Sequence, residues 1–403
     1  MSLSEAMLLD DVRRRLFSPT RSPNPHAIGL ELELIPVHRA TRVPALATTG
    51  EHTSTAEVLS RIGQREGWRE QSIGGDPPSW TLQDGASISF EPGGQIEIST
   101  APQPTASAVI ASTQRLVAML RDGMSNVGIE LVARGVDPYN DIDAVPLQLH
   151  RDRYTGMTRY FDSIGPSGVR MMRQTAALQI NLERGEDPGS RWGLLNALVP
   201  IVVALFANSR EYAGRSTEWA SYRAHLWRTL DRSRTGVIYE DPGYAERYLT
   251  FALDAVAMHS GSNGAAYRPF REWMHEPEVD ETEWLFHLST LFPEVRPKDY
   301  FELRSADTIE PHLLAAPIVF VTGLVYDQES AAGAARSLGA PSEAMLERAG
   351  RVGLSDPEIR RIASVLTELA LSGARRLGED YISLVHLAAA REYFARALGR
   401  NDI

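Results

Sequence analysis

Short segments of this sequence place acidic or amide side chains at every second position, between apolar residues. Such alternation puts successive side chains on opposite faces of a β-strand, so each segment predicts a strand with one apolar and one polar face. The segments are residues 29–34 with Glu31 and Glu33, 95–99 with Gln95 and Glu97, 178–183 with Gln179, Asn181 and Glu183, and 301–304 with Glu302 and Arg304.

The composition of these polar faces indicates chemistry with cations. A sheet with one face in water gives the same alternation, which is an open alternative for any single strand. These faces, however, carry almost only Glu, Gln, Asn and Arg, with few of the Thr, Lys and Ser that are usual on exposed strands. Carboxylates that converge from several strands repel one another unless cations lie between them. Oxygen ligands select hard cations such as Mg²⁺ or Mn²⁺, and carboxylate-bound Mg²⁺ typically serves nucleotide phosphates.

A glycine-rich turn adds a further carboxylate to this group. Residues 91–95, Glu-Pro-Gly-Gly-Gln, separate a strand that ends near Phe90 from the strand that holds Glu97. Pro followed by Gly fits a type II turn, so the two strands are predicted to form a hairpin. The hairpin brings Glu91 into the neighbourhood of Glu97.

Basic residues are concentrated in two places. Residues 208–236 contain six arginines, among them Arg223 and Arg234, in a chain whose formal net charge is −11. Guanidinium groups suit carboxylates and phosphates, so this segment predicts an anion-binding patch, although a solvated helix face with ion pairs explains the same composition. Arg296 and Lys298 lie in a Pro-framed loop before Glu302, where a phosphate contact and an ordinary surface loop are both open readings.

The apolar faces of the strands require helices to cover them. The longest apolar run, residues 192–206, includes Asn196 and Pro200 and predicts a buried helix that is too short for a membrane span. From about residue 330 to 403 the chain is rich in Ala, Leu, Arg and Glu and predicts a helical subregion. In it, residues 355–358, Ser-Asp-Pro-Glu, predict a capping box.

The remaining segments predict loops within a single catalytic domain of residues 1–403. Residues 19–25 and 36–53 are polar and rich in Pro and Thr. Residues 135–168 carry Gly, Pro, Asp and Tyr with weak periodicity, which predicts a long irregular connection near a working surface.

Bulk composition narrows the class of protein. An excess of acidic residues argues against a nucleic-acid partner. The sequence has no cysteine, which excludes a disulfide framework, a thiolate zinc site and a cysteine nucleophile, and suits a cytoplasmic location. The first 17 residues predict an amphipathic helix and not a signal peptide, so no membrane partner is expected.

Several motifs occur in the order that they have in a known enzyme family. The specific blocks are Glu-Pro-Gly-Gly-Gln at 91–95 and Leu-Phe-Pro-Glu-Val-Arg at 291–296. Further matching segments are residues 29–33, 96–99, 171–172, 175–176, 179–182, 207–209, 223–227, 231–236, 287–297 and 302–307. With these motifs the chain resembles the plant-type (family 2) glutamate–cysteine ligases and their bacterial relatives, including the actinobacterial enzymes that make γ-glutamylcysteine for ergothioneine.

The resemblance implies an α+β, glutamine-synthetase-like carboxylate–amine ligase fold, with a curved antiparallel sheet backed by helices. It implies ATP and Mg²⁺, with Mn²⁺ as an alternative, and glutamate and cysteine as the small-molecule substrates. The γ-carboxylate of glutamate takes the γ-phosphoryl group of ATP, and the amine of cysteine then attacks the acyl phosphate. Transfer of a phosphoryl group between anions requires cations that neutralise and align the reacting oxygens.

The resemblance also implies roles for individual side chains. It assigns the metal to Glu31, Glu33, Glu91, Glu97 and Glu302, the substrates to Gln95, Gln174, Asn181 and Arg223, the ATP phosphates to Arg296, Lys298 and Arg234, and catalysis to Glu302 and Arg304.

Gln174 departs from the plant-type pattern, which has an arginine there that is expected to contact substrate; the actinobacterial relatives have a small hydroxyl residue. Arg173, one place earlier, would point the other way on a strand. Two alternatives therefore stay open. One is the same ligase chemistry with a different amine acceptor, and the other is a catalytically silent ATP- or amino-acid-binding homologue. Retention of all five carboxylates argues against a silent protein.

Overall fold

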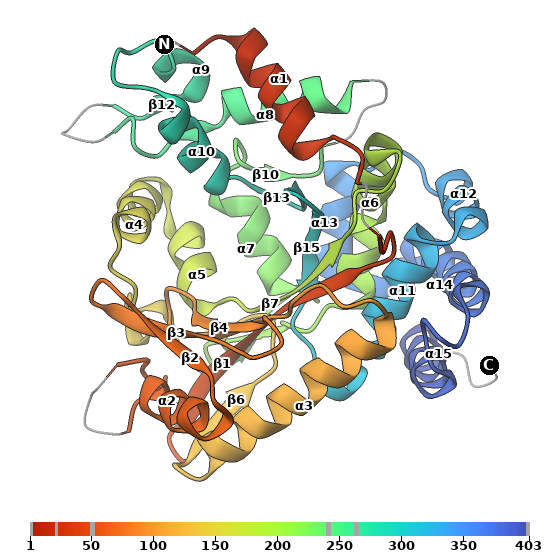
Figure 1. The fold of residues 1–403 in the computed structure, drawn as a ribbon, viewed down its shortest axis with the longest axis horizontal. Coiled ribbons are helices and arrows are strands. Elements are labelled where there is room, and N and C mark those ends of the chain that lie inside the picture. Colours follow the sequence, from red (N-terminus) through yellow and green to blue (C-terminus); the bar gives the residue numbers. More distant parts are fainter. Residues whose placement is uncertain (1–2, 21–22, 49–52, 239–242, 262–265, 400–403) are drawn as a thin grey trace.

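An antiparallel sheet forms the centre of the molecule (Figure 1). The computed structural model describes residues 3–20, 23–48, 53–238, 243–261 and 266–399. Nine strands form the sheet in the order β14-β15-β7-β1-β5-β4-β3-β2, with β6 paired to β1. Their bounds are β1 Ile28–His38, β2 Arg69–Ile73, β3 Asp76–Thr81, β4 Ser87–Phe90, β5 Ile96–Ser99, β6 Ile129–Val132, β7 Ala177–Leu182, β14 Val295–Pro297 and β15 Phe301–Asp307.

The apolar face of the sheet is buried under helices. Leu30, Leu32 and Leu34 of β1 are fully buried, and burial of one such side chain contributes roughly 1.5–3 kcal/mol. Helices α3 (Ala106–Ser125), α6 (Pro188–Leu205) and α11 (Ala315–Val325) cover this face. The alternation of leucine and glutamate in β1 thus decides which face of the strand is buried. The leucines can be buried under the helices only if the glutamates face the opposite side of the sheet.

Two C-terminal helices, α14 (Pro357–Leu377) and α15 (Leu384–Leu398), pack around α11, whose residues are all buried. Helix α6 is longer than the apolar run predicted, so its length and composition alone would allow it to cross a membrane, contrary to the prediction. However, 78% of it is buried inside the protein, as in a core helix and as predicted. The predicted capping box is wrong at α14. Asp356 is the N-cap and accepts from the N–H groups of Glu358 and Ile359, while Pro357 takes the first helical position.

Three helices lie over the polar face of the sheet: α4 (Asp152–Ile164), α5 (Pro166–Gln174) and α7 (Tyr222–Leu230). The other helices are α1 Glu5–Leu16, α2 Thr55–Glu66, α8 Tyr244–Asp254, α9 Phe270–Trp273, α10 Glu281–Ser289, α12 Gln328–Ser337 and α13 Glu343–Val352. Short two-residue strands are β8 Glu211–Tyr212, β9 Arg215–Ser216, β10 Thr235–Gly236, β11 Val256–Ala257, β12 Arg268–Pro269 and β13 Phe292–Pro293.

Two predicted loops differ from the structure. Residues 36–38 continue β1, where Val37 pairs with Glu130 of β6, so the predicted loop 36–53 begins later; its residues 49–52 lie outside the described part. Segment 135–168 is not one irregular connection, because it contains a 3₁₀ turn at Ile142–Ala144 and helix α4. Of the predicted loop 19–25, residues 21–22 lie outside the described part and the others form no helix or strand.

Candidate active site

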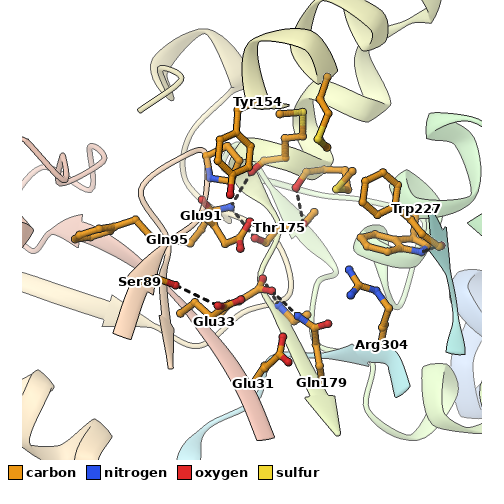
Figure 2. Close-up of a pocket in the computed structure, with 18 of the residues that line it drawn as sticks. Glu31, Glu33, Ser89, Glu91, Gln95, Tyr154, Thr175, Gln179, Trp227 and Arg304 are labelled. Atoms are coloured by element: carbon orange, nitrogen blue, oxygen red, sulfur yellow. Dashed lines mark hydrogen bonds between the residues drawn. The ribbon is translucent and has the colours of Figure 1, made fainter. Parts of the chain in front are cut away.

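A cavity of about 300 Å³ lies between the polar face of the sheet and helices α4, α5 and α7. Figure 2 shows acidic side chains from the sheet pointing into it, with Tyr154 on one side and Trp227 and Arg304 on another. Its lining includes Glu31, Glu33, Glu91, Glu97, Gln95, Arg223, Arg296, Lys298 and Arg304. Segments far apart in the sequence therefore supply one polar cavity.

Strand register explains why the acidic groups meet. Glu33 of β1 lies directly opposite Glu97 of β5, and Glu31 lies opposite Gln179 of β7. Directly paired residues have adjacent side chains on one face of a sheet. Burial, followed by neighbouring carboxylates, raises the pKa of both Glu31 and Glu33 to about 7. Burial and the charges of Glu97 and Glu33 raise the pKa of Glu91 well above its usual value.

Protein donors partly satisfy these carboxylates. Glu33 accepts from the Ala177 N–H at 2.8 Å and from Gln179 Nε2 at 3.1 Å, and Glu31 accepts from Asn181 Nδ2 at 3.0 Å. Within the described part of the chain, no three His, Cys, Asp or Glu side chains are grouped closely enough to form a ready metal site. The carboxylates share the cavity, and these hydrogen bonds leave oxygen lone pairs available to a cation.

The hairpin between β4 and β5 has a different turn from the predicted type II. A type II turn needs positive φ at Gly93, but the positive φ, +87°, is at Gly94. The Gly94 N–H donates to the Glu91 carbonyl at 2.8 Å, and the Glu91 N–H donates to the Gln95 carbonyl at 2.9 Å. This is a type I turn followed by a glycine bulge. It places Glu91 and Glu97 on the same cavity, as the hairpin prediction required.

Glu302 binds cations of the protein itself. Its carboxylate is fully buried and accepts from Arg296 Nε at 2.7 Å, from Lys298 and from Arg304. Burial alone would raise the pKa of Glu302, but the three cations outweigh it and hold this pKa well below its usual range. Glu302 therefore pairs with the basic wall of the cavity, which is formed by Arg296, Lys298 and Arg304. Its charge also helps to raise the pKa of Glu31, and its role as a metal ligand stays a prediction.

Arg223 and Arg304 flank one aromatic ring. Their guanidinium carbons lie 5.1 Å and 5.2 Å from the centre of the Trp227 ring, respectively. The Nε atoms of both arginines are buried, and neither has a hydrogen-bond partner among the described residues. Both side chains line the cavity, where a guanidinium donor without a partner suits an anionic ligand.

Arg234 does not reach the cavity, contrary to the predicted phosphate contact. Its side chain is fully buried and donates to Asp231 at 2.7 Å, to the Thr290 carbonyl at 2.9 Å and to the Val256 carbonyl. These bonds join loops of the chain, which is a structural role. The pattern Asp-Arg-Ser-Arg at 231–234 did not distinguish this from phosphate binding.

Two predicted substrate residues also lie off the cavity wall. Gln174 is the last residue of α5, not part of a strand; it donates to the Asn140 carbonyl at 2.8 Å and accepts from the Tyr212 hydroxyl at 3.0 Å. Asn181 lies beside Glu31. Gln95 does line the cavity, but its amide donates to the Thr175 carbonyl at 2.8 Å and accepts from the Gly93 N–H at 2.9 Å, which fixes the hairpin.

The cavity residues of α4 and of the position before it were missed because they come from the segment that was predicted as irregular. Arg153 and Tyr154 of α4 line the cavity, and Arg151 lies just before that helix. Met157, Met171, Met172, Trp227 and Phe292 form an apolar wall. The spacing Arg151-x-Arg153 beside Tyr154 was the available signal.

An antiparallel sheet that directs glutamates toward arginines and a lysine in one cavity is the arrangement expected of a carboxylate–amine ligase. The chain belongs to glutamate–cysteine ligase family 2, whose profile matches residues 27–376. The predicted resemblance and the predicted fold class are both confirmed.

Individual relatives agree with this assignment. The chain is 32% identical over 347 residues to the glutamate–cysteine ligase EgtA of Mycolicibacterium smegmatis, covering 81% of this chain and 80% of the relative. It is 30% identical to the chloroplastic glutamate–cysteine ligase of Arabidopsis thaliana, over 93% of this chain and 75% of the plant protein. It spans 64% of the tobacco relative. The fold also resembles the glutamate–cysteine ligase of Francisella tularensis solved with AMP, with a TM-score of 0.53 at 10% identity over 95% of this chain and 83% of that one.

Proposed function

We propose that this chain joins the γ-carboxylate of glutamate to the amine of cysteine at the expense of ATP, through γ-glutamyl phosphate. The observation that carries the proposal is the arrangement of the cavity, in which four glutamates face Arg223, Arg296, Lys298 and Arg304. Family membership supplies the reaction class. A cytoplasmic location and the absence of a nucleic-acid or membrane partner stay predictions.

Glu31, Glu33, Glu91 and Glu97 fit a hard divalent cation, Mg²⁺ or Mn²⁺. All are oxygen donors, and the raised pKa values of Glu31, Glu33 and Glu91 record burial and mutual repulsion that a cation would relieve. When bound, the metal neutralises phosphate oxygens and aligns them for transfer. Glu302 supports the phosphate-binding wall in this proposal, because its carboxylate holds the cations of that wall in place.

The basic wall stabilises the reacting anions. A γ-carboxylate oxygen forms a bond to the γ-phosphorus as the bond to the ADP oxygen breaks. Arg296, Lys298 and Arg304 would bind the phosphoryl oxygens, where negative charge has to be neutralised. The amine nitrogen then attacks the acyl carbon, phosphate leaves with the electrons of the C–O bond, and the nitrogen loses a proton. Arg223 would bind a substrate carboxylate through Nε of its guanidinium group, which has no hydrogen-bond partner among the described residues.

The apolar wall favours cysteine over an acceptor whose side chain carries a charge. This wall offers no charged partner to such a side chain, whereas a sulfur atom packs well against aromatic rings. The wall consists of Met157, Met171, Met172, Trp227 and Phe292. Gln174, which motivated the alternative acceptor, lies off the cavity wall, so it gives no specific support for a different amine.

The test is a turnover assay with purified protein, ATP, Mg²⁺, glutamate and a mixture of competing amines at equal concentration. We expect ADP, phosphate and γ-glutamylcysteine in equal amounts, with the products identified by mass spectrometry. Preferential formation of another γ-glutamyl amide would replace cysteine as the acceptor. No ATP consumption with any amine would favour the silent homologue.

A further inference from the structure

Asp307 is a fully buried carboxylate at the end of β15 that has no part in the chemistry described above. One oxygen, Oδ2, accepts from the Asn208 N–H and from the Ser209 hydroxyl, both at 2.7 Å. The other, Oδ1, accepts from the Ser221 hydroxyl at 2.9 Å. Burial of a carboxylate is costly unless hydrogen bonds satisfy it, and three donors do so here.

A β-bulge brings Asp307 to the polar face of the sheet. Glu302 pairs with Asn181 and Leu303 with Ile180, but the register then shifts, so that Ala306 pairs with Leu178 and Asp307 with Ala177. The extra residue of the bulge reverses the alternation of side chains. Asp307 therefore lies on the same face as Arg304, although three positions separate them.

Two serine hydroxyls link the Asp307 carboxylate by hydrogen bonds to the start of α7. The Ser209 hydroxyl accepts from the Arg223 N–H at 3.1 Å, and Ser221, the N-cap of α7, accepts from the Ala224 N–H at 3.1 Å. Because each hydroxyl oxygen accepts a hydrogen bond from a backbone N–H, the hydroxyl hydrogen can be donated to Asp307. The carboxylate thus sits at the positive end of α7, which carries Arg223 in its first turn.

The guanidinium group of Arg223 is held by the same carboxylate. Its Nη1 lies 3.8 Å from Asp307 Oδ1, and both side chains are almost completely buried. Its Nη2 donates to the Arg304 carbonyl at 2.8 Å. The two contacts engage the two terminal nitrogens of the guanidinium group. They leave Nε without a hydrogen-bond partner among the described residues, on a side chain that lines the cavity.

We propose that Asp307 is a positioning residue, which, through Ser209, Ser221 and an ion pair, holds Arg223 in the orientation that binds a substrate carboxylate. The inference rests on the proposed function, in which Arg223 binds that carboxylate. Gly135 is part of the arrangement, because a Cβ atom there would lie 2.4 Å from Asp307 Cγ, so the space beside the carboxylate requires glycine.

The test compares Asp307→Asn with Arg223→Lys. Arg223→Lys should raise the KM of one carboxylate substrate, glutamate or cysteine, and Asp307→Asn should raise the KM of that same substrate by about tenfold, with kcat changed less than about threefold and the KM of ATP unchanged. The double variant should be no worse than Arg223→Lys alone, because Asp307 acts through Arg223. Ser209→Ala, a milder change, should raise the same KM about twofold.

Asp327→Asn is the matched control. Asp327 is also paired with an arginine and a serine, Arg376 and Ser330, but it caps α12 away from the cavity. We expect it to lower the melting temperature without a change in KM. An Asp307→Asn variant that behaves like this control, or whose effect adds fully to Arg223→Lys, would overturn the inference. Calorimetric binding of glutamate and of cysteine to the same variants gives a readout without turnover, so an inactive wild-type protein would refute the proposed function while the inference is still tested.

Discussion

Glu31 and Glu33 share one face of β1, and burial with neighbouring acids raises the pKa of each to about 7. Two ionised carboxylates in such a place destabilise the folded chain unless a cation binds them. The folded chain is therefore less stable without the metal, and the carboxylates are already in place to bind it.

Glu31→Gln should lower kcat by about 10²-fold or more while the fold is retained, because the amide cannot replace a charged oxygen ligand. Turnover at saturating substrate and circular dichroism measure the two effects. Glu130→Gln is the control, since Glu130 is a partly exposed carboxylate paired with Arg42 outside the cavity. Unchanged turnover in the Glu31 variant would remove this residue from the metal site.

The contribution of Glu31 and Glu33 to the stability of the metal-free protein should fall as pH rises from about 4.5 to 7. In this window these two side chains hold more protons in the folded chain than in the unfolded chain, because burial and neighbouring acids raise the pKa of each from its ordinary value of 4.5 to about 7. Stability decreases with pH wherever the folded state holds the extra protons. The contribution is fully lost above pH 7.

Thermal melts with a chelator at pH 5 and at pH 8 measure this effect. Glu33→Gln should melt above the wild type at pH 8, because it removes one repelling charge. Added Mg²⁺ should raise the melting temperature of the wild type more than that of the variant. A Glu33→Gln protein that melts below the wild type without metal would show that the charge at this position is not destabilising.

At the scale of elements, the hairpin that carries Glu91 depends on a close approach to α5. A Cβ atom on Gly93 would lie 1.9 Å from the Arg173 carbonyl oxygen, which is backbone and cannot move aside alone. Gly93→Ala should therefore displace the hairpin, lower activity at least tenfold and lower the melting temperature, as measured by turnover and calorimetry. Gly193→Ala, in an open position of α6, should be neutral or slightly stabilising.

The alternation of apolar and polar residues predicted the central strands of the sheet from the sequence, because side chains at every second position of a strand share one face. It identified Glu31, Glu33 and Glu97 before any pairing was known. It could not place Asp307, since a bulge that reverses the alternation depends on pairing with β7. It also could not distinguish Arg223 from Arg234, because both are buried arginines whose partners come from distant segments.

At the scale of the molecule, the cavity joins two layers. The sheet supplies the glutamates and most of the phosphate-binding wall, while α4, α5 and α7 supply Arg153, the apolar wall and Arg223. Helices α3, α6 and α11 back the sheet, and α14 packs on α11. The C-terminal helices therefore support the cavity without lining it, and we expect them to fold as one unit with the rest of the chain.

The crossing of α11 and α14 allows a test of that expectation. A Cβ atom on Gly373 would lie 2.1 Å from the Gly323 carbonyl oxygen, and one on Gly323 would lie 2.2 Å from the Ala370 carbonyl oxygen. Gly373→Val should separate the two helices and destabilise the whole chain by about 1–3 kcal/mol. Gly339→Val, with no atom near its Cβ position, is the control. Calorimetry should show one transition at a lower temperature, with activity lost at the same temperature, because α11 links α14 to the sheet. Two separate transitions, with activity surviving the first, would show instead that the C-terminal helices form an independent unit.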